Sequence, residues 1–444
     1  MRVADEFSEV DRELLRRGFT RMVFERARIE TLLDLLGNPQ RAYPSIHITG
    51  TNGKSSTART VDSLLRAHGL RTGRYTSPHL ASVRERISLD GEPVSEDRFV
   101  RIYREVEPLA ALVDKRYDEP LTYFDITTAM AFAAFADAPV DVAVVEVGLG
   151  GETDSTNVLA APVCVLTPIG LDHTEWLGDT IEDIAWMKLG IVHRGVTLVS
   201  AAQPDEAAHP ILNHCAEMDA TLAREGSEFG VLRRSLAVGG QELGLQGLSG
   251  AYEGVFLPLH GAHQAQNAAV ALAAVEAFFG AGPNRQLDLD TVRDGFGSVT
   301  VPGRLERVRS SPAVLLDAAH NPAGMAATAA ALVEEFSFRR LVGVVAFLAD
   351  KDVSGMLEQL EPVLDALVVT RNSSSRGMSL DDLAPLARQV FGDERVTVAP
   401  DLLEAVDAAV SLAEAERGVA LSGAGVVVTG SVITVADARR MFFQ

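Results

Sequence analysis

The sequence predicts an α/β protein of two domains, each built around a mostly parallel β-sheet. The chain of 444 residues is longer than one hydrophobic core normally organises, and 47% of its residues are apolar. An apolar strand, a glycine-containing loop and an amphipathic helix follow one another over residues 46–67. Later, strand-like runs alternate with helical stretches, which is typical of a parallel sheet. These runs are residues 314–316, 341–347, 366–370, 396–398 and 426–429.

The sequence changes character after Gly297. We expect a first domain over residues 1–297, a linker over residues 298–303 and a smaller second domain over residues 304–444. Residues 13–36 carry an interrupted helical pattern before the first strand. The Gly-rich residues 228–260 contain short alternating runs, which predict a β-meander.

Charge and composition exclude several classes of protein. The formal net charge of −21 argues against a nucleic-acid surface, which needs a basic face. No apolar segment approaches the roughly 20 residues that cross a bilayer, and the N-terminal sequence lacks the pattern of a signal peptide. Cys164 and Cys215 are the two cysteines. We expect reduced thiols in a cytoplasmic protein, with a structural disulfide as the alternative.

The loop after the first strand has the composition of a phosphate-binding site. It reads Gly50-Thr51-Asn52-Gly53-Lys54-Ser55-Ser56 and leads into a helix. Backbone N–H groups at a helix N-terminus favour anions, Lys54 adds a mobile charge, and Ser55 offers a hydroxyl for magnesium. The first glycine of the common G-x-x-x-x-G-K-[ST] pattern would stand at Ile48, so the match is to a shorter form. An ordinary Gly-rich turn is the alternative.

Polar side chains follow the neighbouring strands. Ser77 comes after a second strand-like run, Glu146 interrupts a β-branched strand, and His173 follows the strand at residues 163–167. A buried carboxylate needs cations nearby, and parallel sheets bind ligands at the carboxyl ends of their strands. Glu146 and His173 therefore suggest a shared metal shell. The alternatives are a capped turn at Ser77, a structural ion pair at Glu146 and a solvated histidine.

Lys188 falls on the apolar face of a predicted helix, in register with Ile181, Ile184 and Ala185. Desolvation lowers the pKa of a lysine and favours the neutral amine, which could react with carbon dioxide to form a carbamate. The alternative is that its stem packs while its ammonium group reaches water.

Together these motifs resemble the folylpolyglutamate synthase and dihydrofolate synthase family, relatives of the Mur ligases. The resemblance runs over nearly the whole chain, and the ordered series is far more specific than one phosphate loop. Its marks are residues 49–54, 76–80, 146–151, 154–157, 171–173, 302–304, 317–322 and 350–352. The resemblance implies a Mur-ligase-like fold, with an N-terminal P-loop ATPase domain and a smaller Rossmann-like C-terminal domain.

The resemblance also implies an ATP-dependent amide ligase that uses Mg²⁺, expected as two ions. ATP would phosphorylate a carboxylate to an acyl phosphate, and the amino group of L-glutamate would displace phosphate to form the amide. The implied acceptors are dihydropteroate and reduced folates. Family members are commonly monomers, so we expect a monomer whose partners are small molecules.

Residue roles follow from the positions that match the family motifs. The ATP-binding positions are Gly50, Thr51, Asn52, Gly53, Lys54, Ser55, Ser56, Asn267, Arg304 and Asp317. The metal positions are Ser77, Glu146, His173 and, as a carbamate, Lys188. The pterin positions are Thr122, Tyr123, Phe124, Asp125, Thr153, Asp154 and Ser155. Lys54, Lys188 and His320 are the expected catalytic residues, with His320 near the incoming glutamate.

Three residues depart from the family pattern. Glu152 stands where the family usually has arginine, Met187 where it has glutamate, and Asp125 where it has glutamate. Two of these positions lie on the pterin side, so the sequence supports the nucleotide chemistry better than the substrate. One alternative is a diverged paralogue that ligates an amino acid to another pterin-like or aryl carboxylate. Another is a non-catalytic nucleotide-binding regulatory protein, and a third is a cell-wall Mur ligase, which the Asn52 loop and the Ser-Pro-His run disfavour.

Overall fold

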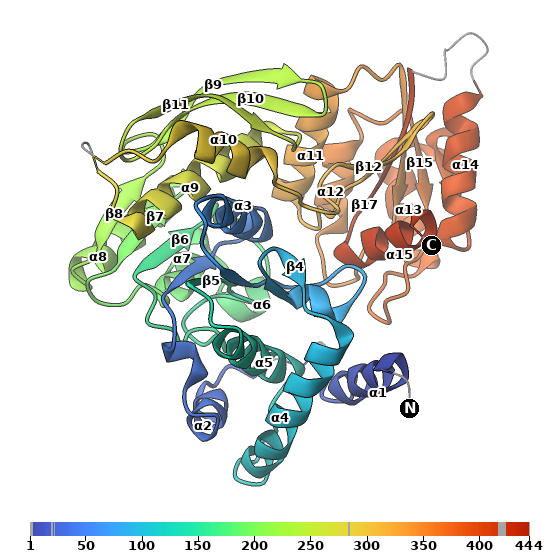
Figure 1. Ribbon diagram of the computed structural model, residues 1–444. Coiled ribbons are helices and arrows are strands. Elements are labelled where there is room, and N and C mark those ends of the chain that lie inside the picture. Colours follow the sequence, from blue (N-terminus) through green and yellow to red (C-terminus); the bar gives the residue numbers. More distant parts are fainter. Residues whose placement is uncertain (1–2, 19–20, 22, 283–284, 416–422, 444) are drawn as a thin grey trace. The chain divides into compact units, whose positions relative to one another are not determined.

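The computed structural model describes residues 3–18, 21, 23–282, 285–415 and 423–443 (Figure 1). The chain divides into two compact units. The first consists of Met1–Ser235, Glu242–Pro258 and Ala265–Thr300, and the second of Leu236–Gln241, Leu259–Gln264 and Val301–Gln444. Two short segments from the middle of the chain thus group with the C-terminal residues.

The first unit is organised around an eight-stranded sheet with the order β4-β3-β2-β5-β1-β6-β7-β8. Strands β2, β5, β1, β6, β7 and β8 are paired in parallel, and β3 and β4 add an antiparallel edge. The β-branched run around Val144 is buried along its whole length, as a strand covered on both faces requires. The strands are β1 (Ser45–Thr49), β2 (Thr72–Tyr75), β3 (Ile87–Leu89), β4 (Glu92–Pro93), β5 (Val142–Glu146), β6 (Val163–Leu166), β7 (Thr197–Ser200) and β8 (Thr221–Arg224).

Helices cover both faces of this sheet, with α3 on one side and α5 with α4 on the other (Figure 1). A capping box begins α5, because Thr122 and Asp125 each accept a hydrogen bond from the backbone N–H of the other. The helices are α1 (Val3–Leu15), α2 (Ala27–Leu35), α3 (Lys54–Ala67), α4 (Glu96–Asp114), α5 (Tyr123–Asp137), α6 (Thr174–Leu177), α7 (Ile181–Leu189), α8 (Asp205–Glu217), α9 (Ala262–Phe279) and α10 (Leu289–Gly297), with 3₁₀ turns η1 (Pro39–Arg41) and η2 (Val83–Arg86).

The N-terminal helical region differs from the expected span. The interrupted pattern predicted over residues 13–36 is divided between α1 and α2, and α1 begins at Val3, before the predicted start. The early helix escaped prediction because its buried face is a narrow stripe, with Val10 and Leu14 among charged residues. Residues 19, 20 and 22 lie outside the described residues.

The β-meander predicted over residues 228–260 is confirmed as a three-stranded sheet with the order β11-β10-β9. Its strands are β9 (Gly230–Ala237), β10 (Gly240–Gln246) and β11 (Ala251–Leu257). Helix α9 follows where the Ala-rich sequence predicts it.

The second unit contains a six-stranded sheet with the order β12-β13-β17-β14-β15-β16. Its strands are β12 (Glu306–Ser310), β13 (Ala313–Leu316), β14 (Arg340–Val345), β15 (Ala366–Val369), β16 (Val396–Val398) and β17 (Ala424–Thr429). The five predicted strands are present and parallel. The antiparallel β12, which has three charged residues among its five, was not among the predicted strands.

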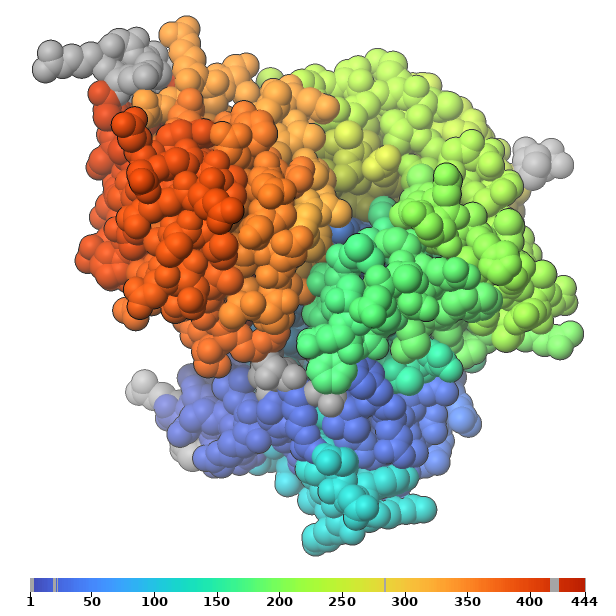
Figure 2. Space-filling model, turned by 180° about the vertical axis from the view of Figure 1, so that it is seen from behind, coloured from blue at the N-terminus to red at the C-terminus, as the bar shows by residue number. Residues whose placement is uncertain are grey.

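Helices complete the second unit, and its C-terminal residues form one continuous mass (Figure 2, orange to red). They are α11 (Pro322–Glu335), α12 (Val353–Leu360), α13 (Leu380–Phe391), α14 (Leu402–Glu414) and α15 (Val432–Phe442), with the 3₁₀ turn η3 (Asp393–Arg395). In the described part of the chain, no helix is long and apolar enough to cross a membrane. Cys164 and Cys215 are both buried free thiols.

Candidate functional site

The candidate site lies at the carboxyl ends of four neighbouring strands of the first unit. Strands β2, β5, β1 and β6 are adjacent, and the register pairs Ile48 with Glu146 and Thr49 with Leu166. Ser77, Glu146, the loop from Gly50 and the loop with His173 therefore all start from this edge. The edge is where a parallel sheet binds its ligands.

The phosphate loop has the backbone that its glycines allow. Gly50 and Gly53 have φ angles of 143° and 88°, and a Cβ at Gly50 would overlap Thr167 Oγ1. The N–H groups of Thr51 and Asn52 donate to the carbonyl oxygen of Pro168, at 3.0 and 3.3 Å. They stabilise the loop itself. Thr57 N–H donates to the carbonyl oxygen of Gly53 at 2.9 Å, so the N-terminal end of α3, which favours anions, lies within this loop.

Two lysines meet at this loop. Lys54 Nζ donates to the carbonyl oxygens of Gly50 (3.0 Å) and Thr51 (3.2 Å), and Lys188 Nζ donates to Gly50 at 2.9 Å. Lys188 is buried, on the face of α7 that its sequence register predicts. Burial, and next the positive charge of Lys54, lower the pKa of Lys188 to about 7. A large share of this lysine is therefore a neutral amine near neutral pH.

Glu146 is buried at the end of β5, close to the phosphate loop. Its carboxylate accepts hydrogen bonds from Ser55 Oγ (2.8 and 3.0 Å) and from the backbone N–H of Ser77 (3.2 Å). A carboxylate beside a serine hydroxyl offers hard oxygen donors that suit Mg²⁺. Within the described residues, no three His, Cys, Asp or Glu side chains gather for a metal ion, so hydroxyls and phosphate oxygens would have to complete a shell.

His173 stands in the left-handed region (φ 53°) and is the residue before α6. Its Nε2 lies 3.8 Å from Oδ1 of Asp172, whose side chain is buried. The charge of Asp172 also acts on Lys188, where it favours the protonated form. Asp172 is thus a further candidate residue that the motif analysis did not single out. Its position beside His173 was the available signal.

Three of the expected pterin residues form one hydrogen-bond network. Asp125 accepts from Thr122 Oγ1 at 2.9 Å and from Ser155 Oγ at 2.6 Å. Arg28 of α2 lies 3.4 Å from the same carboxylate, and both side chains are buried. Arg28 also donates to the carbonyl oxygen of Pro120 at 2.7 Å. Arg28 was not among the predicted residues, because it lies far from Asp125 along the sequence.

The other expected pterin residues make separate contacts. Tyr123 is buried beneath the guanidinium of Arg86, and Phe124 packs so closely on Gly148 that a Cβ there would lie 2.5 Å from the ring. Asp154 is used within its own loop, where it accepts from the N–H groups of Leu149 and Thr156. Burial raises the pKa of the Asp154 carboxyl. Thr153 is half-buried.

Two of the residues that depart from the family pattern contact each other. The backbone N–H of Glu152 donates to the carbonyl oxygen of Met187 at 2.9 Å. The Glu152 side chain is exposed, while Met187 packs against the apolar cluster of α7 and α8. The negative charge at position 152 therefore points to solvent.

Asn267 belongs to the phosphate-loop region. A Cβ at Gly53 would lie 2.5 Å from Asn267 Oδ1, so only glycine fits between this amide and the loop. Asn267 itself is buried.

The predicted residues of the second unit gather at the end of β13. Asp317 accepts hydrogen bonds from Leu305 N–H (3.0 Å), Ala319 N–H (3.0 Å) and Thr328 Oγ1 (2.8 Å). The Leu305 bond holds the turn with Arg304 against Asp317. His320 Nδ1 donates to the carbonyl oxygen of Ala318 at 3.0 Å.

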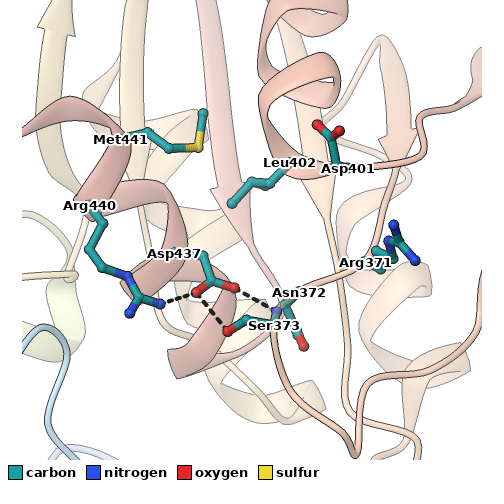
Figure 3. A pocket seen from close by; sticks show the side chains of 8 residues that line it. All are labelled: Arg371, Asn372, Ser373, Asp401, Leu402, Asp437, Arg440 and Met441. Carbon is teal, nitrogen blue, oxygen red and sulfur yellow. Dashed lines mark hydrogen bonds and ion pairs between the residues drawn. The ribbon is translucent and has the colours of Figure 1, made fainter. Parts of the chain in front are cut away.

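A separate pocket of about 380 Å³ lies in the second unit and is lined by none of the predicted residues (Figure 3). Asp437 occupies its centre, where it pairs with Arg440 and accepts from Ser373 N–H (2.7 Å) and Oγ (2.8 Å). The pocket's other charged residues are Arg371 and Asp401. Its charges offset one another, so it shows no preference for an anion or a cation.

The chain matches two family models. Residues 48–275 match the Mur ligase middle domain, and residues 303–425 match the Mur ligase, glutamate ligase domain. It is 54% identical over 442 residues to a dihydrofolate synthase/folylpolyglutamate synthase of Mycobacterium tuberculosis, covering 95% of this chain and 91% of the relative.

Solved structures agree with these matches. A folylpolyglutamate synthase of M. tuberculosis complexed with ADP has a TM-score of 0.95 and 52% identity, and covers 100% of this chain and 99% of its own. FolC of Escherichia coli in complex with DHPP and ADP has a TM-score of 0.84 and 30% identity, covering 99% of this chain and 97% of its own.

Proposed function

The chain belongs to the Mur ligase family and, within it, to the dihydrofolate synthase/folylpolyglutamate synthases, ATP-dependent ligases of glutamate, and from this membership we propose its substrates and residue roles. It joins L-glutamate to dihydropteroate and to tetrahydrofolates that already carry glutamates. The observation that carries the proposal is the convergence of Lys54 and Lys188 on Gly50 of the phosphate loop, next to the Ser55–Glu146 pair.

The reaction has two steps. The substrate carboxylate attacks the γ-phosphorus of ATP, which forms an acyl phosphate and releases ADP. The amino group of glutamate then attacks the acyl carbon, the amide bond forms and phosphate leaves. Phosphoryl transfer needs positioned cations and N–H donors more than covalent help. Lys54 and the first turn of α3 supply these groups.

ATP contacts are assigned to residues 50–56 and Asn267 of the first unit, and to Arg304 and Asp317 of the second. In the first unit, Lys54 would exchange its loop carbonyls for phosphate oxygens when the nucleotide binds. This assignment is supported by the Gly53–Asn267 contact and by the bond from Leu305 to Asp317. His320, which follows the same strand β13, is assigned to the incoming glutamate.

Magnesium ions would be held by Ser77, Glu146 and His173, and the carbamate of Lys188 would serve a second ion. Bound magnesium would offset the charge on the phosphates during transfer. The carbamate forms when the neutral amine of Lys188 attacks carbon dioxide and a proton is released. Its support is the buried position of Lys188 and the low pKa that follows from it.

The pterin ring and its carboxylate-bearing tail are assigned to residues 122–125 and 153–155. The network of Thr122, Asp125 and Ser155 supports this assignment, because it joins both stretches. The Glu152 side chain is exposed, so its charge points away from the buried residues of the loop and leaves the expected pterin site unchanged. This favours a pterin substrate over the other aryl carboxylate of a diverged paralogue. The named ligand DHPP of the E. coli relative is consistent with it.

ADP release is the test. Purified protein with ATP, Mg²⁺ and L-glutamate should release ADP when either dihydropteroate or tetrahydrofolate is added, and Lys54→Ala should abolish that release. Activity on another aryl acid, without activity on either pterin, would instead establish the diverged paralogue. Nucleotide binding without turnover of any acid would establish the regulatory protein.

The domain boundaries, cellular location and assembly belong to the same proposal. We place the first domain at residues 1–297, the linker at 298–303 and the second domain at 304–444. Two buried free thiols support a reducing, cytoplasmic location. We place the protein as a monomer, as the resemblance to the family implies.

A further inference from the structure

The loop that carries the assigned pterin residues is docked on the last turn of α7, next to Lys188. The Glu152 N–H bonds to Met187, and a Cβ at Gly151 would lie 2.6 Å from the carbonyl oxygen of Lys188. On the helix side, a Cβ at Gly190 would overlap Cβ of Glu152. Two glycines, one on each partner, therefore permit this close approach.

Asn157 holds the junction together. Its Nδ2 donates to the carbonyl oxygens of Glu152 (3.1 Å) and Gly190 (3.0 Å), one on the loop and one on the turn after α7. Its Oδ1 lies 2.9 Å from His193 Nε2, and its backbone carbonyl accepts from Arg26 Nη1 at 2.6 Å. The residue is buried, with 3% of its surface exposed.

These contacts determine which atom of the Asn157 amide is the nitrogen and which is the oxygen. Because two carbonyl oxygens face Nδ2, that atom must be the NH₂ group, and Oδ1 must accept from His193. His193 therefore carries its proton on Nε2. A side chain with oxygen at both positions cannot make the same set of bonds.

We propose that Asn157 is a positioning residue that fixes the distance between the pterin loop and Lys188. The inference rests on the proposed function, which assigns Ser155 to the substrate and Lys188 to the phosphate side. Asn157 stands two residues after Ser155, and its amide spans to Gly190, two residues after Lys188. Much of the rate of the first step comes from holding the acceptor carboxylate against the phosphate of ATP. A small displacement of the carboxylate therefore lowers that rate steeply.

The sharpest variant is Asn157→Asp. It keeps the shape of the side chain, but an oxygen now faces the carbonyl oxygens of Glu152 and Gly190, so both donated bonds are lost. We expect kcat/KM for the pterin to fall about tenfold or more, the effect of losing one or two such bonds. The Kd for ADP, measured by calorimetry, should stay within about twofold, because the phosphate loop is untouched.

A matched control is Gln241→Glu. Gln241 lies in the second unit and is also buried, and its Nε2 donates to two backbone carbonyl oxygens, those of Leu259 (2.9 Å) and Gly261 (3.1 Å). The substitution Gln241→Glu also replaces a buried amide by a carboxyl group and removes two donated hydrogen bonds, but it does not alter the pterin loop. We expect the control to lower the melting temperature as much as Asn157→Asp while the pterin KM stays at the wild-type value.

The outcomes separate the two proposals. If the wild-type protein is inactive on every pterin, the proposed function itself is wrong. An active wild type whose Asn157→Asp variant folds and keeps the wild-type pterin KM and kcat overturns the positioning role, as does an equal kinetic loss in Gln241→Glu. If Asn157→Asp does not fold, His193→Leu removes only the bond to Oδ1 and should lower kcat/KM for the pterin by a smaller factor. An unchanged kcat/KM there also overturns the proposal.

Discussion

Lys188 Nζ donates a hydrogen bond to the carbonyl oxygen of Gly50 at 2.9 Å, across 138 residues of sequence. Lys54 uses the same oxygen at 3.0 Å, so two amines share one acceptor. Two ammonium ions around one carbonyl group repel each other, and the burial of Lys188 reduces the screening of that repulsion by water. The neutral form of the buried lysine, Lys188, relieves that repulsion.

Removing the charge of Lys54 should raise the pKa of Lys188. In Lys54→Met the positive neighbour is gone, while the burial of Lys188 is unchanged, so the pKa should move upward from about 7. Labelling with an amine reagent over a pH series, read by mass spectrometry, measures this pKa. Lys351→Met in the second unit is the control, and an identical labelling curve in Lys54→Met would contradict the interpretation.

Activity should depend on bicarbonate and increase with pH around neutrality. The pKa of Lys188 is lowered to about 7, so its neutral amine is the minor form below that pH and the major form above it. Only the neutral amine reacts with carbon dioxide. We expect ADP release to rise between about pH 6 and pH 8 and to drop in bicarbonate-depleted buffer. If the rate of ADP release does not change with added bicarbonate anywhere in this pH range, the carbamate is excluded.

The same lowered pKa makes a prediction for stability. Between about pH 7 and 10, the unfolded state binds a proton at Lys188 that the folded state does not, so the free energy of unfolding should rise with pH. Lys188→Met should flatten this rise. Urea unfolding of both proteins at several pH values checks it, and parallel curves would count against a neutral Lys188.

Gly50→Ala should strongly destabilise the first unit. The new Cβ would overlap Thr167 Oγ1 in a backbone with a φ of 143°. A loss of roughly 2–4 kcal/mol is expected from strain and overpacking together. Gly297→Ala is the control, because nothing lies within 4 Å of its Cβ position. Urea unfolding should separate the two, and equal stability would show that the loop relaxes.

Arg28→Met should unfold the pterin side of the first unit. The substitution leaves the buried carboxylate of Asp125 without its guanidinium 3.4 Å away. Breaking such a pair costs about 3–5 kcal/mol, whereas removing both charges costs much less. Thermal melts of Arg28→Met and of the double variant Arg28→Met/Asp125→Asn measure the difference. A double variant no more stable than the single one would contradict the pair's role.

Local sequence predicted most of the fold and many candidate residues, because the relevant signals lie within a few neighbouring positions. The β-branched run that ends at Glu146 predicts a buried strand, and the glycines at 50 and 53 predict a tight loop before a helix. The spacing from Ile181 to Lys188 identifies the buried face of α7. The start of helix α1 and strand β12 were missed, because charged residues are as numerous as apolar ones in α1 and outnumber them in β12.

Motifs and periodicity by themselves thus determined the α/β class, the glycine loop before α3, the apolar helix face that carries Lys188, and the family. The tertiary structure alone decided which distant groups meet: Lys188 with Gly50, Arg28 with Asp125, and the loop of Glu152 with the end of α7. It also decided that the charge of Glu152 faces solvent. The physical reason is that these contacts depend on the order of strands in the sheet and on close backbone approach, and neither leaves a periodic trace in a single chain.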